Sequence, residues 1–175
     1  LTSEFLINPL KKTIALSGTP LDNIDQECYE IPNFYSKVNL LEHLLENDAD
    51  LSKVLIFVAT KADADRLYEI LSTNNEVSVI HAKKEQNYRT KSIDKFEKGI
   101  SRILIATDVI SRGIDMEKIS CVISFNTPIY PENYIHRIGR TARAGQSGKS
   151  ILFFNEDEKP LKQDIEKLMN QKITQ

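Results

Sequence analysis

Arginines recur at intervals of three residues near the C-terminal end of the sequence, at Arg137, Arg140 and Arg143. No acidic residue lies within residues 133–150, where Lys149 also falls, so this stretch is cationic inside a chain of formal net charge −2. The planar fork of a guanidinium group can bind two phosphate oxygens at once. On a helical turn the three arginines would fall near one face and would repel one another unless an anion joined them. The spacing favours a phosphate site, and a solvated basic helix face is the alternative.

A second segment, ATDVISRGID at residues 106–115, combines a strand end with groups that could hold a nucleotide. Thr107 and Asp108 come directly after the apolar run ILIA, at a place where α/β folds gather their ligands. Gly113 belongs to a tight turn. The carboxylate of Asp115 could accept hydrogen bonds from sugar hydroxyls. The alternative is a loop with ordinary turn and cap residues.

These segments belong to a chain whose apolar pattern alternates between strands and helices. Runs such as VLIFVA and ILIA are apolar throughout, which is typical of parallel strands covered on both sheet faces. We expect strands at 27–31, 53–59, 77–81, 102–107, 121–125 and 150–154, and helices at 35–47, 62–73, 86–98, 132–138 and 157–171. The alternation predicts a doubly wound α/β fold, in which ligands bind at the carboxyl ends of the parallel strands.

Length and composition indicate a single globular domain. The 175 residues are 41% hydrophobic and 27% charged, and no apolar run approaches the roughly 18 residues of a membrane span. We expect no membrane partner, and we expect the protein to be cytoplasmic and monomeric. Cys28 and Cys121 lie far apart in apolar runs, which favours reduced buried thiols over a disulfide or a metal site. His43, His81 and His136 show no metal-ligand spacing, so no metal site is predicted.

Four segments, taken together, resemble the motifs of one family. ATDVISRGID resembles motif V of the DEAD-box RNA helicases, and HRIGRTARAG at 136–145 resembles motif VI. VLIFVATK at 54–61 resembles motif IV, and His81 followed by QNYR at 86–89 resembles the segment HG…QxxR. Order and spacing match over nearly the whole chain. The resemblance implies the C-terminal RecA-like lobe, a three-layer parallel α/β sheet of the P-loop NTPase type with helices on both faces.

The resemblance also implies an ATP site. Arg140 and Arg143 would be arginine fingers that reach the γ-phosphate, and fold-stabilising ion pairs are the alternative for each. Gly113 and Asp115 would contact the nucleotide, with Asp115 on the ribose. Finger arginines contribute roughly 10³–10⁵ in rate in related phosphoryl transfers, which is roughly 4–7 kcal/mol of transition-state stabilisation. Turnover is therefore expected to depend on each finger.

Two further motif VI residues, His136 and Arg137, would lie at the nucleotide site and bridge to the N-terminal lobe of the family. The chain departs from the family pattern at two glycines. Ala82 follows the motif histidine, His81, and Ala142 stands in GRTAR where the family usually has GRTGR. Neither change removes a charged group, but both put the local backbone geometry in question.

By the same resemblance, a track for RNA would be lined by Thr60, Gln86, Arg89 and Thr107. Contacts of this kind to phosphate and sugar position a strand without reading its sequence. Preference for RNA would come from the 2′-hydroxyl and the backbone shape. Thr60 could instead cap the following helix, and Gln86 and Arg89 could belong to a polar helix face.

The sequence lacks the phosphate cradle that such an enzyme needs. A P-loop reads GxxxxGK[ST], but Arg143 occupies the place of the first glycine before Gly148-Lys149-Ser150, which is interpreted as a turn. The DEAD tetrapeptide is also missing, so Mg²⁺ and the ATP phosphates would be held by the N-terminal lobe. Residues 1–18 are interpreted as the end of that lobe and the interlobe linker, and residues 19–175 as the C-terminal domain. This fragment is expected to be inactive alone.

Three other functions remain open. A DNA-unwinding helicase of the same superfamily is disfavoured by the HRxGRxxR pattern, and a Rossmann domain by the absence of GxGxxG after any strand. A stand-alone RNA-binding or regulatory docking module without ATPase activity would have no need of the motif arginines. HAKKEQNYR and the stretch before motif VI resemble bacterial, RhlE-like members of the family. The sequence does not identify the RNA.

Overall fold

The computed structural model describes residues 23–108, 119–142 and 147–174. Within these ranges a six-stranded sheet has the order β1-β6-β5-β2-β4-β3, and every neighbouring pair is parallel. The strands are β1 (Ile24–Glu30), β2 (Val54–Val58), β3 (Val77–Ile80), β4 (Ile103–Thr107), β5 (Cys121–Ser124) and β6 (Gly148–Phe154). The predicted parallel sheet is confirmed.

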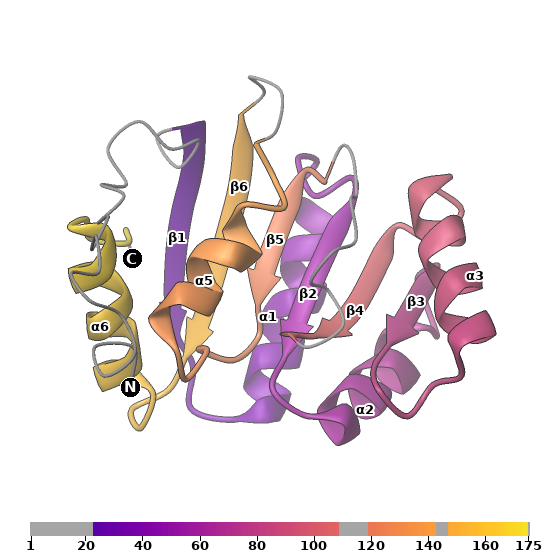
Figure 1. The fold of residues 1–175 in the computed structure, drawn as a ribbon, viewed down its shortest axis with the longest axis horizontal. Helices are drawn as coiled ribbons and strands as arrows, with labels where there is room; N and C mark the ends of the chain where they lie inside the picture. Colours follow the sequence, from indigo (N-terminus) through magenta and orange to yellow (C-terminus); the bar gives the residue numbers. More distant parts are fainter. Residues whose placement is uncertain (1–22, 109–118, 143–146, 175) are drawn as a thin grey trace, which may run out of the picture.

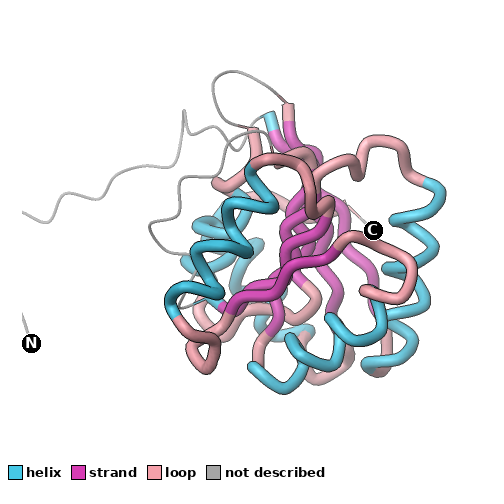
Figure 2. Tube along the Cα trace, turned by 90° about the vertical axis from the view of Figure 1, so that its right-hand side faces the viewer, coloured by secondary structure: helices cyan, strands magenta, loops and turns pink. Residues whose placement is uncertain are grey.

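Helices cover both faces of this sheet (Figure 1, Figure 2). Two of them, α1 (Phe34–Asn47) and α2 (Lys61–Leu71), pack on one face through a shared apolar cluster. The other face carries α3 (Gln86–Glu97), α5 (Pro131–Ile138) and α6 (Lys159–Met169). The predicted three-layer α/β architecture is therefore confirmed.

The apolar composition of β2 and β4 explains why these strands lie inside the sheet and not at its edge. All five residues of β2 and all five of β4 are buried, because each strand has a neighbour on both sides and helices above and below. β1 lies at the edge of the sheet, and its residues alternate between buried and exposed positions. Its start at Ile24 was predicted three residues too late, since this alternation gives a weaker signal than a continuous apolar run.

The tripeptide Gly148-Lys149-Ser150 was predicted to be a turn, and this is wrong. It opens β6, where Gly148 and Lys149 pair with Ile24 and Asp25 of β1. Hydrogen bonding to an edge strand is long-range information that a local turn pattern does not carry.

The cysteines, the metal-binding residue types and the lengths of the helices bear on the sequence predictions for the described residues. Cys28 and Cys121 are free and buried, as predicted, and burial raises the pKa of both thiols. No cluster of His, Cys, Asp and Glu able to hold a metal occurs in the described ranges. No helix in those ranges is long and apolar enough to cross a membrane.

The carboxyl ends of β2 and β5 form a point where the chain diverges. These strands are neighbours, but the chain leaves β2 for α2 on one face and leaves β5 for α5 on the opposite face. Open α/β sheets bind their ligands at such a divergence, beyond the carboxyl ends of the strands. Thr60, Thr107 and Asp108 lie at this edge, which is called the carboxyl edge below.

Candidate functional site

A buried arginine joins the helix of motif VI to the strand end of motif V. Arg137, on α5, is 2% exposed, and its Nε and Nη2 donate to the two carboxylate oxygens of Asp108 at 2.6 and 2.7 Å. Its Nη1 donates to the backbone carbonyl of Asn126 at 2.8 Å. The group also lies 5.1 Å from the centroid of the Phe57 ring, which adds a cation–π contact. Arg137 therefore links α5 to the ends of β4 and β5.

This pairing bears on the predicted nucleotide contact of Arg137. Three of the five guanidinium N–H groups are already engaged within the domain, and the side chain is buried, so a phosphate could reach Arg137 only if the group became exposed. His136, its neighbour on α5, is exposed, as a residue facing another lobe would need to be. Its role in bridging lobes stays a prediction.

Of the motif VI arginines, Arg137 lies on α5 but Arg140 does not. α5 ends at Ile138 and is capped by Gly139, and the backbone N–H of Arg140 donates to the carbonyl of Arg137 at 3.0 Å. Arg140 therefore sits in a turn after the helix, whose end at Ile138 agrees with the prediction, and the helical face considered for the arginines does not extend to Arg140. The hydroxyl of Thr141 then donates to the carbonyl of Ile119 at 2.6 Å and fixes the segment that follows Arg140.

The substituted glycine of motif VI adopts a backbone that explains the family preference. Ala142 has φ of 54°, in the left-handed region that favours glycine. A Cβ on Gly148 would lie 2.7 Å from the backbone nitrogen of Ala142 and still closer to the hydroxyl of Thr141. Gly148 therefore permits the start of β6 to approach the segment after Arg140, and this is its role in place of a P-loop.

Lys149 belongs to the cationic stretch in the sequence, but its side chain pairs with two carboxylates of the fold. Its ammonium group lies 2.9 Å from Asp48 Oδ2 and 3.0 Å from Glu27 Oε1, near the start of β6. Burial alone would lower the pKa of Lys149, but hydrogen bonds to Asp48 and Glu27 raise it well above its usual value. The stretch 133–150 is thus not a single cationic surface, since Lys149 and Arg137 each face carboxylates within the fold.

Two threonines predicted to contact RNA lie at the carboxyl edge. Thr107 is the last residue of β4 and is paired with Val58 of β2, and Thr60 follows two residues beyond Val58. Thr60 caps α2: its hydroxyl oxygen accepts from the Asp63 N–H at 3.0 Å, and the hydroxyl donates to the Asp63 carboxylate at 2.7 Å. The cap that we considered as the alternative role is present, and Thr60 remains exposed at the edge.

A buried histidine holds the loop that leads to α3. His81 is 1% exposed, and its Nδ1 accepts from the Lys83 N–H at 3.3 Å, so Nε2 carries the proton that is donated to Asp65 at 2.9 Å. Lys84 also binds Asp65, at 2.9 Å. Burial alone would raise the pKa of Asp65, but the bonds from His81 and Lys84 hold it below its usual range. Asp65, which the sequence reading missed, thereby fastens this loop to α2.

Gln86 and Arg89 occupy the first turn of α3, directly after the fastened loop. Gln86 is exposed and Arg89 is half-buried. The Nε of Arg89 is buried and makes no hydrogen bond to the described residues. The candidates for RNA contact therefore follow three adjacent strands, β2, β4 and β3, along one half of the carboxyl edge.

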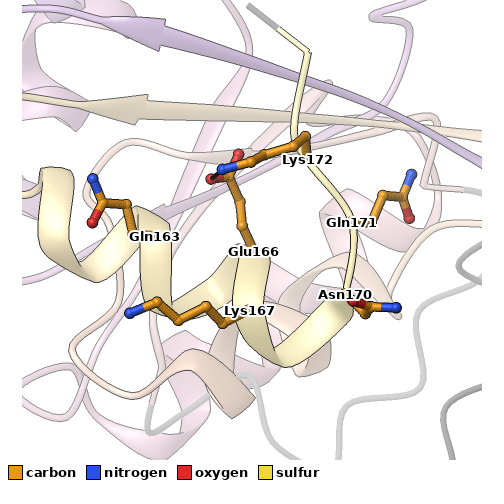
Figure 3. Close-up of a pocket in the computed structure, with 6 residues that line it drawn as sticks. All are labelled: Gln163, Glu166, Lys167, Asn170, Gln171 and Lys172. Atoms are coloured by element: carbon orange, nitrogen blue, oxygen red, sulfur yellow. Dashed lines mark hydrogen bonds and ion pairs between the residues drawn. The ribbon is translucent and has the colours of Figure 1, made fainter.

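A depression of about 410 Å³ lies elsewhere, at the C-terminal end of α6, and is lined by Gln163, Glu166, Lys167, Asn170, Gln171 and Lys172 (Figure 3). Glu166 accepts hydrogen bonds from Lys162 at 2.9 Å, from the backbone N–H of Ile173 at 3.0 Å and from Lys172 at 3.1 Å. Burial alone would raise the pKa of Glu166, but these bonds lower it. The carboxylate stabilises the C-terminus and offers no candidate group for catalysis.

Some predicted site residues lie outside the described residues: Gly113, Asp115 and Arg143. Their roles stay predictions. Asn126 lies at the carboxyl edge between the candidate groups, and the sequence reading missed it. Its position directly after the apolar run CVISF was the signal available.

Comparisons with known proteins identify the family of this chain. The family described as helicase conserved C-terminal domain matches residues 36–145. The chain is 38% identical to the ATP-dependent RNA helicase DBP2 of Candida albicans over 98% of this chain and 31% of that protein, so it spans about a third of that relative.

Among solved structures, the DEAD-box protein SrmB of E. coli bound to regulator of ribonuclease activity A superposes with a TM-score of 0.82 and 30% identity, over 86% of this chain and 89% of that one. The C-terminal domain of the DEAD-box protein Dbp5 has a TM-score of 0.79 and 34% identity, over 88% and 90% of the two chains.

Proposed function

This chain belongs to the helicase conserved C-terminal domain family of the DEAD-box proteins, and from that membership we propose that it acts as the C-terminal lobe of an ATP-dependent RNA helicase. The observation that carries the proposal is the link between motifs V and VI. The side chain of Arg137 reaches from α5 to Asp108 and to the backbone of Asn126 at the carboxyl edge, where the RNA candidates also lie. The turn that follows α5 lies beside the starts of β5 and β6.

In the proposed division of labour, the N-terminal lobe binds Mg²⁺ and the phosphates of ATP, because the P-loop and DEAD sequences do not occur in this chain. This chain supplies Arg140 and Arg143 to the γ-phosphate, and Gly113 and Asp115 to the rest of the nucleotide. The position of Arg140 supports this assignment, since the turn after α5 is anchored on both sides, by Arg137 and by Thr141. A guanidinium that is already held in position can stabilise the charge that develops in the transition state without first changing its own position.

The proposed RNA surface runs along β2, β4 and β3, through Thr60, Thr107, Gln86 and Arg89. Arg89 is half-buried in the first turn of α3, and a guanidinium in that position suits phosphate oxygens. Closure of the two lobes would require both ligands, so ATP and RNA should bind with positive coupling.

The test is an ATPase assay on two polypeptides, the 175-residue chain alone and the same chain placed after a DEAD-box N-terminal lobe. We expect RNA-stimulated hydrolysis from the second and none from the first. Robust hydrolysis by the 175-residue chain would contradict the proposal. RNA binding without any stimulated hydrolysis by the two-lobe polypeptide would favour a binding or docking module.

The RNA surface has its own test in the salt dependence of binding to single-stranded RNA. Arg89→Ala should reduce the slope of log K against log salt by about 0.7, the effect of one lost phosphate contact. Lys98→Ala is the matched control, because Lys98 lies just beyond the other end of the same helix. Equal slopes for the two variants would remove Arg89 from the RNA surface.

We further propose a cytoplasmic monomer. The bacterial, RhlE-like resemblance stays a proposal as well, because relatives from yeast, plants and E. coli all match this chain. Size-exclusion chromatography with light scattering tests the monomer.

A further inference from the structure

Asn126 makes hydrogen bonds both to the loop after β2 and to Arg137 on α5. It lies two residues beyond β5, and its side-chain Oδ1 accepts a hydrogen bond from the backbone N–H of Ala59 at 3.1 Å. Ala59 directly precedes Thr60, the N-cap of α2. The backbone carbonyl of Asn126 accepts from Arg137 Nη1 at 2.8 Å. A single residue thus bonds to the loop proposed to contact RNA and to the arginine that anchors motif VI.

The residues on both sides of Asn126 are held in place by hydrogen bonds of their own. Upstream, the N–H of Phe125 donates to the carbonyl of Phe57 at 2.9 Å, which holds the end of β5 against β2. Downstream, the N–H of Thr127 donates to Glu158 at 3.2 Å, and Glu158 is paired with the buried Lys37 at 2.9 Å. Because these bonds hold the backbone on both sides of Asn126, a displacement of the Ala59 loop would reach Arg137 through Asn126 itself.

Arg137 would carry such a displacement onward. Its two bonds to Asp108 are fork-like and its side chain is buried, so the guanidinium has little freedom to absorb a shift on one side. The carbonyl of Arg137 also accepts the N–H of Arg140. The path therefore runs from Ala59 through Asn126 to Arg137, and then to the turn that holds Arg140.

We propose that Asn126 is a positioning residue that couples the RNA-contacting loop at Thr60 to Arg137 and the arginine-bearing turn after α5. The coupling rests on the proposed RNA surface, whereas the hydrogen-bonded link itself does not. A side-chain acceptor at position 126 is the chemical requirement. Asn126→Asp keeps an oxygen at this place, and Asn126→Ala removes it.

The first experiment follows the 175-residue chain by ¹⁵N nuclear magnetic resonance during titration with a single-stranded oligouridine RNA. The reporters are the Thr60 amide and the Nε–H of Arg137, which is buried and hydrogen-bonded and so exchanges slowly with water. In the unsubstituted chain and in Asn126→Asp, RNA should shift both signals. In Asn126→Ala the Thr60 shift should persist and the Arg137 shift should disappear.

A second experiment needs no RNA. Ala59→Pro removes the N–H that Asn126 accepts while leaving Asn126 and Arg137 in place. It should shift the Arg137 Nε–H signal in the unsubstituted background and leave it unchanged in the Asn126→Ala background. This is a double-mutant cycle on the link itself. Asn74→Ala, at an exposed asparagine in the turn after α2, is the matched control and should change neither response.

The outcomes separate the coupling from the proposed function. An Arg137 signal that responds equally with and without the Asn126 side chain, in either experiment, overturns the coupling. An Arg137 signal that ignores Ala59→Pro in the unsubstituted background also overturns it. If RNA shifts no signal at Thr60, the proposed RNA surface fails and the cycle with Ala59→Pro decides alone. Circular dichroism confirms that each variant is folded, and Asn126→Asp supplies the result if Asn126→Ala does not fold: loss of the Arg137 response there overturns the coupling.

Discussion

Replacing Arg137 by alanine should lower the free energy of unfolding of the chain by about 3 kcal/mol. Removing one partner of a buried ion pair costs roughly 3–5 kcal/mol, because the other charge stays behind without compensation. Asp108 is 27% exposed in the pair, so water can hydrate part of its carboxylate and the cost should fall at the low end. The carbonyl of Asn126 and the ring of Phe57 would lose a contact as well.

Urea unfolding followed by circular dichroism measures this change. With a slope near 2 kcal/mol per molar urea, a loss of about 3 kcal/mol moves the midpoint down by about 1.5 M. Arg66→Ala is the control, because Arg66 is exposed and stacks on Phe34, a contact worth about 0.5–1 kcal/mol. A cost below about 1 kcal/mol for Arg137→Ala, or one equal to the control, would refute the argument that the pair is a buried anchor.

Further substitutions test other parts of the structure. Ala142→Gly should stabilise the chain by about 1 kcal/mol, measured by urea unfolding, because residue 142 has φ of 54°. Gly148→Ala should destabilise it by about 1–3 kcal/mol in the same assay, since the added methyl would overlap Thr141. Glu166 has a lowered pKa in the folded chain, so its contribution to stability is present above about pH 4.3 and is lost as the pH falls through the folded pKa. Glu166→Gln should therefore flatten the dependence of the urea midpoint on pH between about pH 5 and 3.

Each of these has a result that would contradict it. A destabilised Ala142→Gly variant would mean that the left-handed backbone carries no strain there. An unchanged midpoint for Gly148→Ala would mean that β6 does not approach Thr141 closely. An acid transition of unchanged steepness in Glu166→Gln would move the source of acid sensitivity to other carboxylates, with Asp65 the next to test.

The fold could be predicted well where the sequence signal is local. Continuous apolar runs at β2 and β4 report burial on both faces, and the structure confirms them within one residue. The edge strand β1 was located less well because only three of its seven residues are buried. The start of β6 was missed because Gly148 and Lys149 are in a strand only through pairing with β1.

The site could be predicted by residue type but not by partner. The spacing of the motif VI arginines marked a cationic site, but Arg137 is neutralised by Asp108, which lies 29 residues away in the sequence. Local spacing says nothing of such a pairing, because the sheet order brings the two together. Asn126 and Asp65 were missed for the same reason, because each acts on residues distant in the sequence: Asn126 bonds to Ala59, and Asp65 bonds to His81.

The proposed role of Arg140 in ATP hydrolysis is tested by the RNA-stimulated turnover number of the two-lobe polypeptide with Arg140→Ala. A finger arginine predicts a fall of roughly 10³–10⁵ in kcat, with ATP binding retained and Arg66→Ala unaffected. Stimulated turnover by Arg140→Ala equal to that of the Arg66→Ala control would show that Arg140 is not an arginine finger.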